Sequence, residues 1–132
     1  MRIALFPLAT VLFPQGVLPL RIFEARYLDM VRDCMRDGTL FGVTLITDPR
    51  ASEVSRTTSL ADVGCLARIE AWDMKQLGVL HIRAVGQDRF RLLQTEVQAD
   101  GLVLADVDPR QYRRYGMGDA FYAYPSRFHR AA

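Results

Sequence analysis

One stretch of this chain, residues 24–37, has the three-to-four-residue apolar spacing of an amphipathic helix. Its apolar positions are Tyr27, Leu28, Val31, Cys34 and Met35. Gly38 follows the last of them, where a left-handed residue commonly closes a helix. Glu24 begins the stretch, and a carboxylate there can accept backbone N–H groups and complement the helix dipole. We therefore expect one helix of about three turns near the amino terminus.

Most of the remaining chain consists of short segments with the alternating or continuous apolar character of strands. They are residues 3–8, 17–23, 40–46, 63–72, 79–85, 89–95 and 102–107. Pro7 and Pro19 interrupt the first two, which indicates edge or bulged strands because proline lacks an N–H. The unbroken apolar run at 40–46 indicates a strand buried on both faces. Turns are expected at 73–78 and at Asp100-Gly101, with a long surface loop at 47–62.

The order of these segments predicts the fold class. Six or seven strands, one helix near the amino terminus and antiparallel connections indicate an α+β domain that is mainly β, built as a partly closed barrel. A chain of 132 residues, 50% of them apolar, is large enough for one hydrophobic core and too small for two. We expect residues 1–107 to form that core, since every periodic segment ends by Val107.

Residues 108–132 differ from the rest in charge and in pattern. They hold five arginines and two aspartates, a formal charge of +3, so residues 1–107 sum to −1 against a total of +2. Aromatic residues lie among these arginines without helical or strand periodicity, so we expect a poorly ordered basic tail. Such a mixture could contact phosphates and stack bases, which makes RNA binding an alternative function. The near-neutral remainder argues against nucleic acid as the main partner.

The two cysteines, Cys34 and Cys65, lie far from each other and from any histidine cluster. Without a Cys-x-x-Cys pair or a His/Cys cluster, the sequence predicts no metal site and no cofactor. We expect both thiols to be buried in a protein of a reducing compartment, the cytoplasm. Pro7 and Pro14 interrupt the apolar start, and no run of about 20 apolar residues exists, so neither a signal peptide nor a membrane span is expected.

Residues that could catalyse a reaction are scattered. The single lysine, Lys75, lies in the polar turn at 73–78, so the chain has neither a Walker A loop nor a Ser-Lys dyad. His81 lies on a predicted strand beside Arg83, and His129 lies in the tail. Neither has the acidic partner that orients a catalytic histidine. The sequence therefore predicts a binding module that is not an enzyme, and it assigns no catalytic residue.

Two groups of short motifs remain. The first half of the chain contains Leu5-Phe6-Pro7-Leu8, Val11-Leu12-Phe13-Pro14, Pro19-Leu20, Ile22-Phe23-Glu24 with Arg26-Tyr27, and Phe41-Gly42-Val43. The second half contains Val63-Gly64-Cys65-Leu66-Ala67 and Gly86-Gln87-Asp88-Arg89-Phe90-Arg91. In this order, over residues 1–107, they resemble the amino-terminal (LON, or substrate-binding) domain of the ATP-dependent Lon protease, in its stand-alone form.

The resemblance implies a PUA-like pseudo-barrel that binds unfolded or partly unfolded proteins and lacks the ATPase and protease domains. Stand-alone members, common in bacteria, usually continue from the barrel into helices. This sequence departs from them after Val107, so residues 108–132 can also be a remnant of such an extension. An unpaired strand edge near the proline-rich start would suit an extended peptide. No contact residue is assigned, because we expect these large apolar residues in the core: Phe6, Leu12, Phe13, Leu20 and Phe23.

Overall fold

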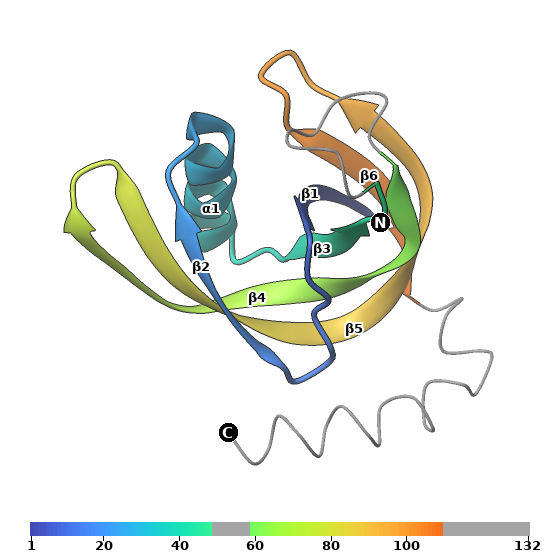
Figure 1. Ribbon diagram of the computed structural model, residues 1–132, viewed down its shortest axis with the longest axis horizontal. Helices are drawn as coiled ribbons and strands as arrows, with labels where there is room; N and C mark the ends of the chain where they lie inside the picture. Colours follow the sequence, from blue (N-terminus) through green and yellow to red (C-terminus); the bar gives the residue numbers. More distant parts are fainter. Residues whose placement is uncertain (49–58, 110–132) are drawn as a thin grey trace.

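The computed structural model describes residues 1–48 and 59–109. Its elements are, in chain order, β1 (Arg2–Leu8), β2 (Val17–Ile22), α1 (Ala25–Asp37), β3 (Phe41–Ile46), β4 (Leu60–Gln76), β5 (Val79–Val97) and β6 (Val103–Asp108). This element content confirms the predicted α+β, mainly β, class (Figure 1). No helix within these ranges is long and apolar enough to cross a membrane. Nearly all of the predicted tail and most of the predicted loop at 47–62 lie outside the described residues.

The strands form one mixed sheet that closes on itself. Their order is β2-β5-β4-β3-β1-β6, and β6 also pairs with β5, which completes a ring. One edge of β5 pairs with two strands: residues 80–85 pair with β2, and residues 91–97 pair with β6. Its other edge pairs with β4. The result is the predicted pseudo-barrel, with α1 packed beside it (Figure 1).

Three local predictions were wrong. β1 and β3 pair in parallel rather than antiparallel, because the connection between them contains β2 and α1 and is long enough for a crossover. The segments predicted at 79–85 and 89–95 are one strand, β5, since the ladder to β4 continues through a bulge near Gly86. β4 begins at Leu60 and runs to Gln76, so the hairpin turn consists only of Leu77 and Gly78.

Buried apolar side chains fill the barrel and the space beneath α1. Tyr27, Met30, Val31 and Cys34 form the buried face of the helix. Inside the ring, Phe90 is fully buried and takes the space that glycines leave open: a Cβ at Gly64 would lie 2.3 Å from Phe90 Cζ. Each large apolar side chain buried in this way stabilises the fold by about 1.5–3 kcal/mol. Packing around Phe90 thus explains two small residues of the sequence motifs, Gly42 and Gly64.

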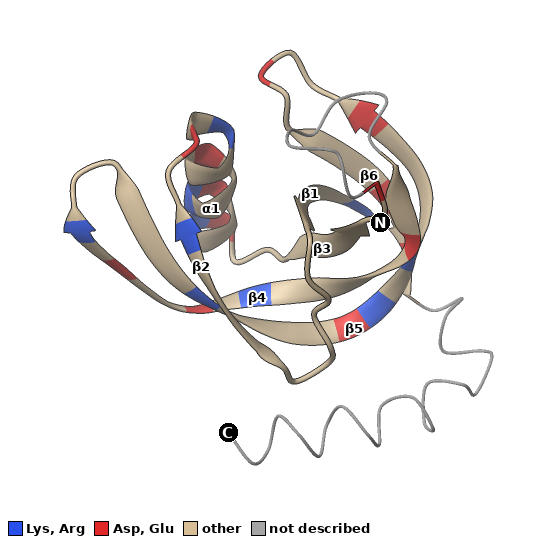
Figure 2. Ribbon diagram, viewed as in Figure 1, with Lys and Arg blue, Asp and Glu red and all other residues tan. Residues whose placement is uncertain are grey.

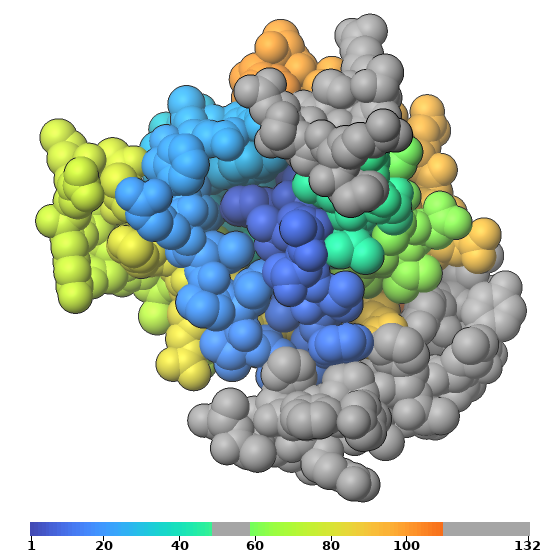
Figure 3. Space-filling model, viewed as in Figure 1, coloured from blue at the N-terminus to red at the C-terminus, as the bar shows by residue number. Residues whose placement is uncertain are grey.

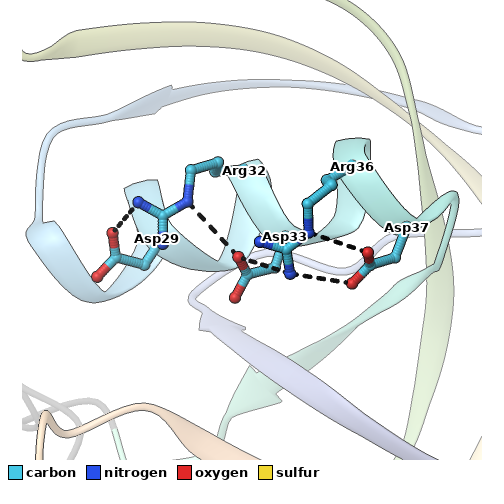
Figure 4. A network of polar contacts seen from close by, with 5 residues as sticks. All are labelled: Asp29, Arg32, Asp33, Arg36 and Asp37. Carbon is cyan, nitrogen blue, oxygen red and sulfur yellow. Dashed lines mark hydrogen bonds and ion pairs between the residues drawn. The ribbon is translucent and has the colours of Figure 1, made fainter.

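The ends and the exposed face of α1 show how the helix is stabilised locally. Gly38 closes it with φ 67°, as predicted, but Glu24 makes no side-chain capping bond, so that part of the prediction was wrong. Along the exposed face, aspartates and arginines alternate in a chain of ion pairs (Figure 4). Their N···O distances run from 3.0 to 3.5 Å between Asp29, Arg32, Asp33, Arg36 and Asp37. Exposed pairs of this kind contribute only about 0.3–0.5 kcal/mol each.

Candidate functional site

A groove of about 260 Å³ lies between the carboxyl-terminal half of β2 and the end of β1. We call it the β1–β2 groove, and its apolar lining consists of Phe6, Pro7, Leu8, Leu20, Ile22, Phe23, Tyr27 and Ile46. The polypeptide around it is the amino-terminal part of the chain, drawn in shades of blue on the face toward the viewer in Figure 3. Four elements therefore contribute to one apolar site: β1, β2, β3 and α1.

β1 and β2, the strands on the two sides of this groove, each have an edge with no strand partner among the described residues. β6 pairs with β1 only from Arg2 to Leu5, so residues 6–8 have β3 on one side and no strand on the other. β2 pairs with β5 alone. The barrel is thus closed by β6 at one end and left open between β1 and β2 at the other. This agrees with the prediction that the proline-containing strands would have edge positions.

The hydrogen-bonding pattern of β2 shows which backbone groups face outward. Gly86 N–H donates to Gly16 O at 2.8 Å, so the backbone groups of Gly16 and of every second residue after it face β5. The backbone N–H and C=O groups of the residues between them, Val17, Pro19 and Arg21, then point away from β5. Proline fits this pattern, because at Pro19 the missing N–H costs no bond to β5. The outer edge of β2 therefore presents carbonyl groups at all three positions and N–H groups at two.

The floor of the groove is an aromatic stack. Phe6 and Tyr27 lie face to face, with ring centroids 4.3 Å apart and planes within 9° of parallel. Phe6 also contacts Phe41, at 6.4 Å between centroids. Burial raises the pKa of the Tyr27 phenol, so this ring stays neutral at physiological pH. The floor is thus an apolar surface of packed aromatic rings.

Charged groups border the groove at the junction between β2 and α1. The Glu24 carboxylate accepts from Arg26, with Nε at 3.0 Å and Nη2 at 2.9 Å. Arg26 also donates to Gly101 O at 3.1 Å and lies 4.8 Å from the centroid of the Tyr27 ring. One arginine therefore ties the start of the helix to the turn before β6. Arg21 lies on the other side, with its guanidinium carbon 5.4 Å from the centroid of the Phe23 ring.

Phe23 was predicted to lie in the core, and that prediction was wrong: its side chain is 57% exposed. Phe6 and Leu12 are buried as expected, while Phe13 and Leu20 are half-buried. Ile22 takes the inward position at the end of β2, and the alternation of the strand then turns Phe23 outward. An exposed aromatic ring beside an apolar groove is a common feature of binding surfaces.

The segment between β1 and β2, residues 9–16, is fixed to β5 at Gly86. Gln15 N–H donates to Gly86 O at 2.8 Å, in addition to the bond from Gly86 to Gly16. Gln15 adopts φ 66°, the left-handed conformation that favours glycine. Arg89, buried to 6% exposure, lies with its guanidinium 5.2 Å from the centroid of the Phe13 ring. These contacts hold the position of β2 and so define one wall of the groove.

Comparison with known proteins places this chain in a family. Residues 2–115 match the substrate-binding domain of the ATP-dependent protease La (LON). The chain belongs to the LON substrate-binding domain family. Among solved structures, a Lon N-terminal domain protein from Xanthomonas campestris is 42% identical, with a TM-score of 0.70, and the match covers 82% of this chain and 59% of that one. The N-terminal domain of Lon protease from the Mycobacterium avium complex shares the fold, with a TM-score of 0.62 at 11% identity over 83% of this chain and 54% of that one.

Cereblons are also similar to this LON domain in sequence. The cereblon of Danio rerio is 31% identical over 75% of this chain, and that of Gallus gallus is 29% identical over 73%. The chain spans only 23% and 21% of the lengths of those two proteins. The family match confirms the resemblance read from the sequence motifs.

Other residues considered in the sequence are not gathered into a site in the described part of this LON domain. Lys75 is exposed near the tip of the β4–β5 hairpin, 3.9 Å from Asp73, and His81 is exposed on β5. His129 lies outside the described residues. Cys34 and Cys65 are free and buried, as predicted, and burial raises the pKa of the Cys65 thiol to about 12. Within residues 1–48 and 59–109, no group of three metal-ligating side chains occurs.

The RNA-binding alternative depends on the tail, which lies outside the described residues. Figure 2 shows acidic and basic positions mixed along α1, β4 and β5. Several cations are paired: Arg83 Nε lies 3.1 Å from Glu70, and Arg2 contacts both Glu96 and Asp106. Mixed and paired charges do not make the continuous positive surface that phosphate binding requires.

A second groove, of about 420 Å³, lies between the end of α1 and the β4–β5 hairpin. Trp72 and Met35 line it and are 61% and 39% exposed. Leu77, at the hairpin tip, is 94% exposed. This surface also borders a strand edge, because β3 pairs with β4 only as far as Ala67 and the described residues place no strand beside residues 68–72 on that side. Its lining also includes the charged Arg68 and Glu70.

Proposed function

We propose that this domain binds extended segments of unfolded or partly unfolded proteins in the β1–β2 groove and catalyses no reaction on them. The observation that carries the proposal is the free outer edge of β2 beside an apolar groove with an exposed Phe23. A free edge can pair with the backbone of any extended segment, while a groove accepts its apolar side chains. Unfolded chains offer both features and folded proteins seldom do. The family's description as a substrate-binding domain supports the same role.

The chemistry of the groove suits binding of many sequences rather than one. Main-chain hydrogen bonds along β2 require no particular side chain, and the Phe6–Tyr27 floor offers a flat apolar surface without a deep pocket. We also propose the cytoplasm as the location, since two free buried thiols are typical of a reducing compartment.

The test is binding of fluorescein-labelled casein, followed by fluorescence anisotropy. Phe23→Ala should weaken binding about 5- to 30-fold, because removing an aromatic anchor from an interface commonly costs about 1–2 kcal/mol. Leu77→Ala is the matched control, since it removes an even more exposed apolar side chain at a distance from the groove. Equal weakening by both variants, or no binding by the natural protein, would contradict the proposal. Casein fragments produced by the pure protein would contradict its non-catalytic part.

A further inference from the structure

The charges around the β1–β2 groove do not cancel. The Glu24 carboxylate is occupied by Arg26 through two contacts of 3.0 and 2.9 Å, and this arginine is only 17% exposed. Arg21 is exposed and has no ion pair with a carboxylate in the described part of the chain. Its contact is the Phe23 ring, which holds the guanidinium at the edge of the groove. Among the described residues, the groove therefore carries one positive charge that no carboxylate pairs with.

The neighbours of Arg21 across the sheet do not supply a carboxylate either. In the β2–β5 ladder it stands opposite His81, and the next outward residue of β2 is Pro19, opposite Arg83. Asp73 stands opposite His81 on β4, two strands away from Arg21 and nearest to Lys75. Arg83 is engaged by Glu70. Since none of these described neighbours supplies a carboxylate, a ligand strand along the free edge can provide one to Arg21.

The geometry of strand pairing fixes where that carboxylate must be. In an added strand, the residue opposite Arg21 projects to the same face as Arg21, with Cβ atoms about 4.5–5.5 Å apart. The residues before and after it project to the other face, where Leu20 and Ile22 line the groove. In a ligand segment with an acidic residue between two apolar residues, the carboxylate can pair with Arg21 while the apolar side chains enter the groove.

Resting on the function proposed above, we propose that the groove selects extended segments with the pattern apolar–acidic–apolar, the acidic side chain pairing with Arg21. The preferred partner is thus an extended protein segment with this pattern, bound more tightly than an apolar segment that lacks the acidic residue. An exposed ion pair of this kind changes affinity about two- to fivefold, and salt reduces the difference.

Three short fluorescein-labelled peptides test this, identical except at the centre: isoleucine–glutamate–leucine, isoleucine–glutamine–leucine and isoleucine–lysine–leucine. The natural protein should bind the glutamate peptide about two- to fivefold tighter than the glutamine peptide at low salt, and less so at about 0.5 M salt. Arg21→Gln should remove the preference, and Arg21→Glu should transfer it to the lysine peptide. Arg32→Gln, on the exposed face of α1, is the matched control and should leave the preference intact.

Equal binding of the glutamate and glutamine peptides to the natural protein would overturn the acidic preference, as would a preference that survives in Arg21→Gln. If casein and all three peptides bind equally, the acidic preference fails while the proposed function stands. If neither casein nor any peptide binds, both fail. Urea unfolding of the Arg21 variants checks their fold, and the salt dependence of the natural protein provides the test if a variant is unstable.

Discussion

The contact between residues 9–16 and β5 makes Gly86 the residue at which a single methyl group should do most damage. A Cβ at this position would lie 2.1 Å from Phe13 O and 2.9 Å from Phe13 C, both backbone atoms. The segment would have to retreat by about 1 Å to reach the 3.0–3.4 Å of a tight contact. That movement stretches the two hydrogen bonds of 2.8 Å that join Gly86 to Gln15 and Gly16.

The cost of Gly86→Ala follows from these contacts. Loss of two hydrogen bonds costs about 0.5–1.5 kcal/mol each, and crowding in a packed region costs about 1–3 kcal/mol. The sum, about 2–6 kcal/mol, is a large part of the stability of about 5–15 kcal/mol that is usual for a domain. With a urea dependence of about 2 kcal/mol per M, the unfolding midpoint should fall by roughly 1–3 M.

Urea unfolding followed by circular dichroism measures this shift, with Gly38→Ala as the matched control. Gly38 has φ +67° and no atom within 4 Å of its would-be Cβ, so an alanine there meets only the conformational cost of about 1–2 kcal/mol. A midpoint for Gly86→Ala no lower than that for Gly38→Ala would refute the reasoning. It would mean that the segment moves freely away from β5 and that the wall of the groove is not fixed there.

Three further predictions concern stability and one concerns RNA. Burial raises the pKa of the Cys65 thiol from 9.0 to about 12, so ionisation of this thiol favours the unfolded state as pH rises from about 9 towards 12. Over that window the free energy of unfolding, measured in urea, should fall by at most about 1.4 kcal/mol per pH unit, and Cys65→Ala should flatten the fall. Arg26→Gln removes the bond to Gly101 O and should cost about 1–2 kcal/mol in the same assay, whereas Arg32→Gln should cost at most about 0.5 kcal/mol; equal losses would contradict the role of Arg26. A chain that ends at Asp108 should unfold at the same urea concentration as the full chain, and a large loss would show that the tail belongs to the fold. Short labelled RNAs should show no binding that falls steeply with salt, and such binding would favour the RNA alternative.

The elements that depend on local pattern could be predicted from the sequence. The apolar spacing of residues 24–37 gave the helix, and Gly38 marked its end correctly because the left-handed conformation there is a local property. The parallel pairing of β1 with β3 could not be predicted from either segment alone, since it depends on the crossover between them. Gly86 lies where the segments at 79–85 and 89–95 were separated, but the ladder to β4 continues past it through a bulge, so β5 is one strand.

Only part of the β1–β2 groove could be predicted from the sequence. A free edge near the proline-rich start was foreseen from Pro19, because a missing N–H implies an outward position. Phe23 was assigned to the core because residue type alone favours burial, although the two-residue period of β2 would have placed it with Arg21 on the outward face. The role of Arg89 in holding Phe13 appears only when strands distant in sequence are brought together.

The position of β1 in the ring has a consequence for how the domain folds during synthesis. β1 is made first, but the partner of its residues 2–5 is β6, the last strand in the described chain, in pairs such as Arg2 with Asp106. Until β6 has emerged, that edge of β1 stays exposed, and an exposed edge is a template for pairing with other chains. Contacts so distant in sequence also slow folding. Nascent chains that have not reached Asp108 are therefore the species most prone to aggregate, and the last residues of β6 end that exposure.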